Sequence, residues 1–213
     1  MNTTLLPLNY YLNDNVFDSI LPPRQQQLSK IHWTPLQVAK KAASFLAQKP
    51  GTKVLDIGSG VGKFCLAAAH YFPNAEFYGI EQRKDLVEIA KKAKNISETS
   101  NAYFKHGNFT QINFNDYQSI YFYNSFCENL IDKEVLCDFN NSGDLIDMAH
   151  IDDLLEYSLS LYTYYSNYLH KVLDNMPSGT RLVTFHGSEI EVPYSYKMVE
   201  DHFEKALRFW VRI

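Results

Sequence analysis

Cysteine pairs, long apolar runs and an excess of basic residues are all missing from this 213-residue chain. The three cysteines, Cys65, Cys127 and Cys137, include no C-x-x-C pair, which fits neither a disulfide framework nor a zinc site. No window of about 18 apolar residues occurs, and the first residues lack the pattern of a secretory leader. The chain carries 20 Lys and Arg against 24 Asp and Glu, so no overall basic field would attract nucleic acid or an anionic membrane. We therefore expect a soluble cytoplasmic protein with no strong nucleic-acid signal and no membrane partner, although a local basic patch stays open.

Metal-binding patterns are also missing. The seven histidines form no H-x-x-x-H or H-E-x-x-H arrangement, and we expect no metal site. His186 lies at the end of a predicted strand, at the carboxyl edge of the sheet where ligands bind, but we interpret it as a core or rim residue.

Hydrophobic patterns predict strands that alternate with helices. Thr34-Pro35 has the character of an N-cap followed by a first-turn proline, and the helix that begins there ends before Pro50-Gly51. Apolar runs predict strands over 52–58, 76–81, 102–108, 119–126 and 181–187, and helices over 63–71, 85–94 and 151–176. The residues expected on the inner face of the last helix are Leu154, Leu155, Leu159, Tyr162, Tyr165, Leu169 and Leu173.

The end of the chain has a different pattern. Residues 195–203 and 206–213 are strand-like runs with only a tight connection between them, which predicts a hairpin. The fold class that follows is α/β, a doubly wound, mostly parallel seven-stranded Rossmann-like sheet with a terminal antiparallel hairpin. The length suits one domain, which we place at 33–213, with residues 1–32 as an N-terminal arm or lead-in.

Alternating glycines separate the first strand from the next helix. Gly58, Gly60 and Gly62 allow a tight turn and a close approach of a ligand to the backbone, beside the free N–H groups of a helix start. A dinucleotide fingerprint would need glycine where Lys63 stands, and the carboxylate of Asp56 disfavours a pyrophosphate. Asp56 suits a cationic group instead, such as the ammonium of an amino acid.

Glu81 ends the second strand, about 20 residues beyond the loop, where a carboxylate binds the two hydroxyls of a ribose. Together with the loop, this position indicates a nucleoside with a cationic tail. A dinucleotide oxidoreductase is a weaker alternative.

Four successive motifs carry a family resemblance. D-I-G-S-G-V-G at 56–62, F-Y-G-I-E at 77–81, H-G-N-F at 106–109 and F-Y-N-S-F at 122–126 resemble the motifs of class I S-adenosylmethionine-dependent methyltransferases, in the same order over roughly residues 33–187. Within that superfamily the motif sequences are most similar to those of histone lysine methyltransferases of the disruptor-of-telomeric-silencing type. The N-P-P-Y form of the fourth motif is absent, which disfavours methylation of DNA adenine.

The resemblance implies a role for each matching residue. Asp56 and the loop backbone, with Ser59 among its cofactor-binding residues, would hold the methionine part of S-adenosylmethionine, and Glu81 its ribose hydroxyls. Asn108 and Phe109 would flank the adenine, with Gln82 as a further candidate on that side. Trp33 and Thr34 belong to a lead-in segment that related enzymes often fold over the cofactor. The complete set of expected cofactor-binding residues is Trp33, Thr34, Asp56, Gly58, Ser59, Gly60, Gly62, Glu81, Gln82, Asn108, Phe109 and Asn124.

Asn124 and Phe126 are the expected catalytic residues. Methyl transfer from a sulfonium is an in-line displacement, which needs alignment more than a strong acid. The amide oxygen of Asn124 can accept a hydrogen bond from an incoming amine, and Phe126 can pack on the methyl group or on the alkyl stem of the acceptor. A protein lysine is the leading acceptor. The alternatives are a small molecule, if the tyrosine-rich helix and the arm close a small pocket, and a catalytically silent cofactor-binding or interaction domain.

Overall fold

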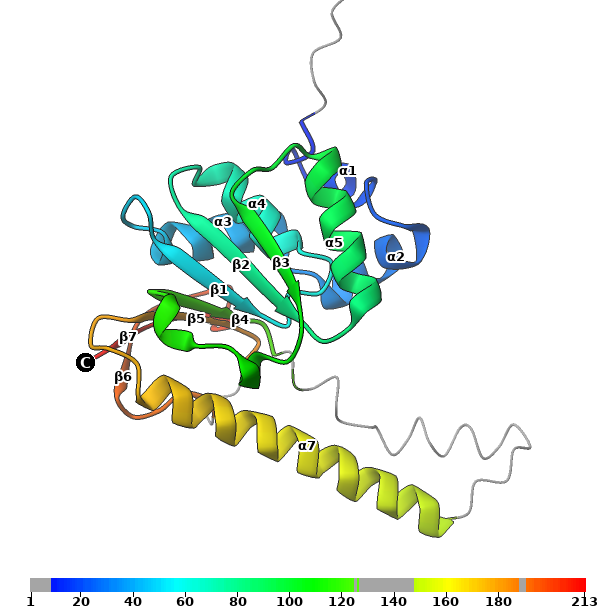
Figure 1. The fold of residues 1–213 in the computed structure, drawn as a ribbon, viewed down its shortest axis with the longest axis vertical. Helices are drawn as coiled ribbons and strands as arrows, with labels where there is room; N and C mark the ends of the chain where they lie inside the picture. Colours follow the sequence, from blue (N-terminus) through cyan, green and yellow to red (C-terminus); the bar gives the residue numbers. More distant parts are fainter. Residues whose placement is uncertain (1–8, 125, 127–147, 188–190) are drawn as a thin grey trace, which may run out of the picture.

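A seven-stranded sheet forms the centre of the protein (Figure 1). The computed structural model describes residues 9–124, 126, 148–187 and 191–213, without the side chains of residues 148–152. The strands lie in the order β3-β2-β1-β4-β5-β7-β6. Their bounds are Lys53–Ile57 (β1), Glu76–Glu81 (β2), Ala102–His106 (β3), Ser119–Phe122 (β4), Arg181–Phe185 (β5), Tyr196–His202 (β6) and Leu207–Arg212 (β7).

Strands β1 to β5 are parallel, while β7 pairs antiparallel with both β5 and β6. The order reverses at β1, which lies between β2 and β4, and a ligand cleft is expected outside the carboxyl ends of the strands at such a point. The predicted doubly wound sheet with a terminal hairpin is therefore confirmed, and β7 is an inner strand.

Helices cover both faces of the sheet. The helices are α1 (Asp14–Asp18), α2 (Pro23–His32), α3 (Leu36–Leu46), α4 (Lys63–Tyr71), α5 (Lys84–Ile96) and α7 (Met148–Asp174), with short 3₁₀ turns at Phe109–Gln111 and Phe114–Asp116. Alternate strand residues explain the two layers: Val54 belongs to the apolar cluster under α3 and α4, while Leu55 belongs to the cluster with Leu169 and Leu173 of α7. In Figure 1, α7 lies on the opposite side of the sheet from α3, α4 and α5.

The start of α3 differs from the prediction. The helix begins at Leu36, and Thr34 is not its cap: the Thr34 hydroxyl lies 2.9 Å from the Tyr121 hydroxyl in the interior. The backbone N–H of Leu36 donates instead to the Asp14 carboxylate at 3.0 Å. The predicted N-cap was wrong because α1, some twenty residues earlier, supplies the acceptor.

The inner face of α7 was also predicted too long. Leu169 and Leu173 are buried, but Leu154 and Leu159 are 39% and 57% exposed. The amino-terminal half of α7 extends past the sheet (Figure 1), so none of the strands that the structure describes lies beneath it. Strands β3 and β4 likewise end earlier than predicted, at His106 and Phe122, and Asn124 adopts a left-handed turn conformation with φ of 33°.

Candidate functional site

A cavity of about 800 Å³ lies at the carboxyl ends of β1, β2, β4 and β5 and is bordered by the end of α2. It forms at the point where the strand order reverses, as the topology requires. The structure brings together eight of the predicted site residues in its walls, namely Trp33, Gly58, Gly60, Glu81, Gln82, Phe109, Asn124 and Phe126. The predicted residues that are not in its walls are Thr34, Asp56, Ser59, Gly62 and Asn108.

The glycine loop wraps around the end of β2. The N–H groups of Gly58 and Ser59 both donate to the carbonyl of Ile80, at 2.9 and 3.1 Å. The Ser59 side chain packs over Gly79, where a Cβ would lie 2.6 Å from the Ser59 Oγ. Ser59 therefore fixes the loop on β2 and faces away from the cavity.

Gly62 serves the packing of this loop. Its φ of 79° is left-handed, and a Cβ there would lie 2.5 Å from the Phe104 ring and 2.9 Å from the Ala90 Cβ. Only glycine allows both the conformation and the close approach of α4 to β3 and α5.

Glu81 is held at the edge of the cavity by two backbone groups. Its Oε2 accepts from the Gly60 N–H and its Oε1 from the Arg83 N–H, each at 2.9 Å. A carboxylate oxygen can accept more than one hydrogen bond, so both oxygens keep capacity for a pair of hydroxyl donors from a ligand. The geometry suits the ribose diol that the sequence predicts for this position.

Asp56 lies beneath the loop. It is 3% exposed and accepts a hydrogen bond from the Cys65 Sγ at 3.4 Å. Burial raises the pKa of Asp56 to about 8; the Cys65 hydrogen bond opposes this rise, and the negative charge of Glu81 adds to it. Direct contact of Asp56 with a cationic ligand stays a prediction.

Trp33 forms the part of the cavity wall that packs against the glycine loop. A Cβ on Gly60 would lie 2.7 Å from the Trp33 Cζ3, so the ring and the loop backbone are in tight contact. The indole N–H donates to the Gln25 carbonyl at 2.9 Å, which anchors the ring to α2. The lead-in segment thus contributes a rigid side chain to the site.

Aromatic rings form the far end of the cavity. Phe126 is 3% exposed and stacks on Phe109 and Tyr165, with ring centroids 5.2 and 5.7 Å apart. Asn108 supports this cluster from outside: its Nδ2 donates to the Tyr165 hydroxyl at 3.0 Å, and its Oδ1 accepts from the Thr110 N–H at 3.0 Å. An apolar end of this kind suits a flat heterocycle.

The ends of β4 and β5 line the other end of the cavity. Asn124 and His186 follow these neighbouring strands and both have left-handed φ values, 33° and 51°. Tyr123 donates from its hydroxyl to the Ile31 carbonyl at 2.9 Å, which joins β4 to α2, and burial raises its pKa. Non-glycine residues in such conformations are uncommon and concentrate at functional sites.

Four residues that line the cavity were not predicted from the sequence, namely the half-buried Tyr123 and the exposed Lys30, His32 and Arg83. Tyr123 lies inside the fourth motif, and this position is the one feature of the sequence that could have indicated Tyr123 as a site residue. Lys30 and His32 enter the site because α2 packs beside the loop, which no local pattern indicates.

Among the residues that the structure describes, no helix is both long enough and apolar enough to cross a membrane. The same part of the chain holds no group of three or more His, Cys, Asp or Glu side chains arranged to bind a metal ion.

Comparison with known proteins gives a family. Residues 48–181 match the model of a methyltransferase domain, and no curated protein matches the chain. Among solved structures, the chain is similar to an RNA methyltransferase from Salinibacter ruber in complex with S-adenosyl-L-homocysteine, with 18% identity, 84% of this chain and 92% of that chain covered, and a TM-score of 0.55. It is also similar to TrmN from Thermus thermophilus (16% identity, 88% and 51% covered, TM-score 0.55) and to a mutant of MtNAS in complex with S-adenosylmethionine (11% identity, 89% and 66% covered, TM-score 0.53).

The chain thus spans about half of TrmN and two thirds of MtNAS. At these identities the solved structures show a shared fold, whereas the family model covers well over half of the chain. The chain belongs to the methyltransferase-domain family.

Proposed function

We propose that this protein is an S-adenosylmethionine-dependent methyltransferase that transfers the methyl group to an amine nitrogen. The observation that carries the proposal is the Glu81 carboxylate, held by the Gly60 N–H at 2.9 Å, at the edge of a large cavity. Family membership supports the reaction class, and S-adenosylmethionine is the cofactor.

The residues of the cavity fit this cofactor. Glu81 presents acceptor oxygens for the ribose, and the apolar end around Phe109 and Leu86 suits the adenine. The bare backbone of Gly58 and Gly60, enclosed by Trp33, suits the methionine part. The bound cofactor supplies an electrophilic methyl group on a sulfonium.

In our proposal the acceptor enters at the end of the cavity that Asn124 and His186 line. In our proposal the Asn124 amide oxygen accepts a hydrogen bond from the incoming amine and directs its lone pair at the methyl carbon. The N–C bond forms as the C–S bond breaks, and the bonding electrons return to sulfur. The amine must be neutral when it attacks, and the aromatic ring of Tyr123, next to Asn124 in the cavity wall, lowers its pKa by desolvation.

A protein lysine is the acceptor that we propose. Exposed residues at the end of α2 and the exposed His186 line the cavity, and in our proposal a long side chain from another protein enters between them. The cationic side chains of Lys30 and Arg83 line the cavity at exposed positions, which favours a lysine with acidic neighbours over a basic histone tail. The similarity to histone lysine methyltransferases of the disruptor-of-telomeric-silencing type stays a prediction.

A small-molecule amine is the second candidate. The cavity volume is near the upper end of the range for small-molecule sites, roughly 300–1,000 Å³. This size favours a site that holds the cofactor together with a small acceptor.

Calorimetry is the first test. We expect S-adenosylmethionine and S-adenosyl-L-homocysteine to bind and nicotinamide dinucleotides not to bind. Binding of the dinucleotides alone would refute the cofactor assignment.

Transfer of labelled methyl groups into a cell extract identifies the acceptor. Label on lysine of a protein supports the proposal, label only in metabolites supports the second candidate, and label only in RNA contradicts both. Asn124→Ala should keep cofactor binding and lose transfer, whereas the exposed Asn95→Ala on α5 is the matched control and should leave both unchanged. A wild type that binds the cofactor but transfers no methyl group would indicate a silent cofactor-binding domain.

A further inference from the structure

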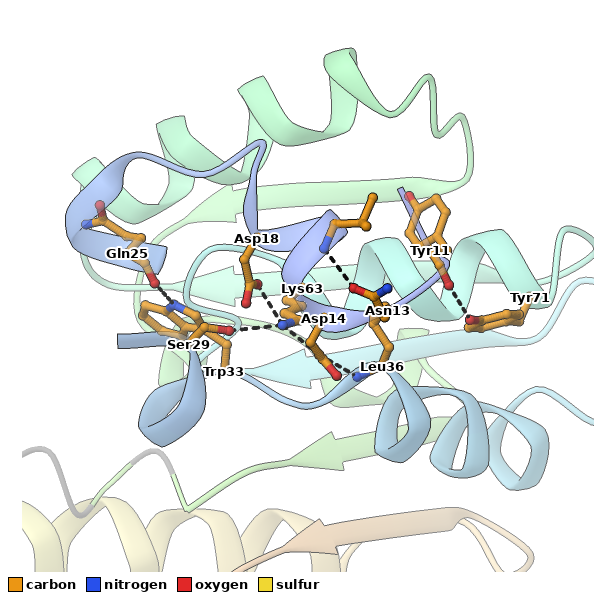
Figure 2. A network of polar contacts seen from close by, with 11 residues as sticks. Tyr11, Asn13, Asp14, Asp18, Gln25, Ser29, Trp33, Leu36, Lys63 and Tyr71 are labelled. Carbon is orange, nitrogen blue, oxygen red and sulfur yellow. Dashed lines mark hydrogen bonds and ion pairs between the residues drawn. The ribbon is translucent and has the colours of Figure 1, made fainter. Parts of the chain in front are cut away.

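Lys63, the first residue of α4, is 2% exposed although it carries a charged side chain. Its Nζ contacts the Asp14 carboxylate at 2.8 Å and the Asp18 carboxylate at 2.7 Å. It also donates to the Ser29 Oγ at 3.0 Å. Figure 2 shows these partners around the ammonium group. All three partners belong to α1 and α2, so a single side chain next to the glycine loop joins the loop to both N-terminal helices.

The position of this cation is unfavourable by itself. The start of a helix carries a partial positive charge, and a buried ammonium has lost its water. Two carboxylates compensate for both effects. The charge of Lys63 is therefore compensated only while α1 and α2 are docked on the loop. Burial of the ammonium group and docking of the two helices thus depend on each other.

The same contacts lead to the cofactor pocket. Ser29 lies one helical turn before Trp33, and its carbonyl accepts the Trp33 N–H at 3.3 Å. The Trp33 ring in turn covers Gly60, three residues before Lys63. Lys63 thus contacts Ser29, Ser29 bonds to Trp33, and Trp33 packs on Gly60, which the loop backbone connects to Lys63. Lys63 itself is not in the wall of the cavity.

We infer that Lys63 is a positioning residue of the cofactor site: by ion-pairing with Asp14 and Asp18 it docks α1 and α2 on the glycine loop and holds Trp33 against Gly60. The inference rests on the proposed function of this cavity. It goes beyond that function because it makes residues 14–33 part of the cofactor site and names the interaction that keeps them there.

The test compares the wild type with Lys63→Met in the full chain. The cofactor dissociation constant should rise by about tenfold, which corresponds to a docked population reduced to roughly one tenth. Trp33 fluorescence should shift to longer wavelength, and proteolysis between residues 19 and 33 should become faster. A Trp33→Phe variant identifies the Trp33 component of the emission, since Trp210 is the second tryptophan. At saturating cofactor, kcat should stay within about twofold, because the KM for the cofactor carries the effect.

Two further variants keep the inference falsifiable. Asp14→Asn removes one charge but keeps an oxygen for the Leu36 N–H, and it should weaken cofactor binding about threefold, in the same direction, even if Lys63→Met does not fold. Lys91→Met removes a lysine paired with Glu88 at 3.0 Å on the exposed face of α5, and it should change nothing.

The inference is overturned if folded Lys63→Met or Asp14→Asn binds the cofactor like the wild type with unchanged Trp33 emission. If the wild type itself fails to bind S-adenosylmethionine, the proposed function falls. The emission and proteolysis of the variants then still decide whether Lys63 docks the helices.

Discussion

Gly62→Ala is the substitution whose effect can be worked out most directly from the structure. Gly62 has a φ of 79°, and the added Cβ would lie 2.5 Å from the Phe104 ring and 2.9 Å from the Ala90 Cβ. Ala90 is fully buried on α5 and its Cβ cannot move without a shift of the backbone, whereas the half-buried Phe104 ring on β3 would have to turn out of its packed position.

Two costs add at this position. A left-handed conformation costs an L-residue roughly 1–2 kcal/mol, and overpacking of a core typically costs about 1–3 kcal/mol. We expect Gly62→Ala to lower the free energy of unfolding by about 2–5 kcal/mol.

Gly51→Ala separates the two costs. Gly51 has nearly the same φ, 77°, but no atom lies within 4 Å of its added Cβ. Both substitutions remove the same glycine flexibility from the unfolded chain. Gly51→Ala should therefore cost only about 1–2 kcal/mol.

Urea denaturation followed by circular dichroism measures both variants. Equal losses for Gly62→Ala and Gly51→Ala would refute the steric argument. A double variant adds a second check: Gly62→Ala should cost less in a Phe104→Ala background than in the wild type, because the clash with the ring is gone.

Three further predictions concern the site and the sheet. Glu81→Gln replaces an acceptor oxygen by an amide nitrogen that faces the N–H of Gly60 or Arg83, so calorimetry should show a cofactor affinity lower by about ten- to a hundredfold. Glu76→Gln at the other end of β2 is the control. An equal loss of affinity in the control would contradict the assignment of Glu81 to the cofactor site. The pKa of Asp56 is raised from 3.8 to about 8 in the folded protein, so its contribution to stability is fully present below about pH 4 and is lost as the pH rises to about 8. Over this pH range the free energy of unfolding should fall less in Asp56→Asn than in the wild type. Parallel pH profiles for the variant and the wild type would disprove the raised pKa of Asp56. Deletion of residues 206–213 removes the inner strand β7 and should abolish cooperative thermal unfolding, whereas a truncated protein that still unfolds cooperatively would contradict the topology.

The sequence alone predicts the sheet, the terminal hairpin and the glycine loop, because each depends on local preferences. Strand residues alternate or run apolar according to which faces are covered, and Gly58, Gly60 and Gly62 stand where the backbone must adopt left-handed angles. Glu81 could be placed at the site for a similar reason, since the carboxyl ends of parallel strands meet at one edge.

Contacts between distant segments were decided only by the tertiary structure. Asp14 rather than Thr34 caps α3, Leu159 is exposed because α7 runs past the sheet, and Asp56 is buried beneath the loop. Lys63 appeared in the sequence only as a departure from a dinucleotide fingerprint, and its partners lie more than thirty residues away. A buried charge depends on whatever packs around it, and that packing depends on where α1 and α2 dock, which no local pattern in the sequence specifies.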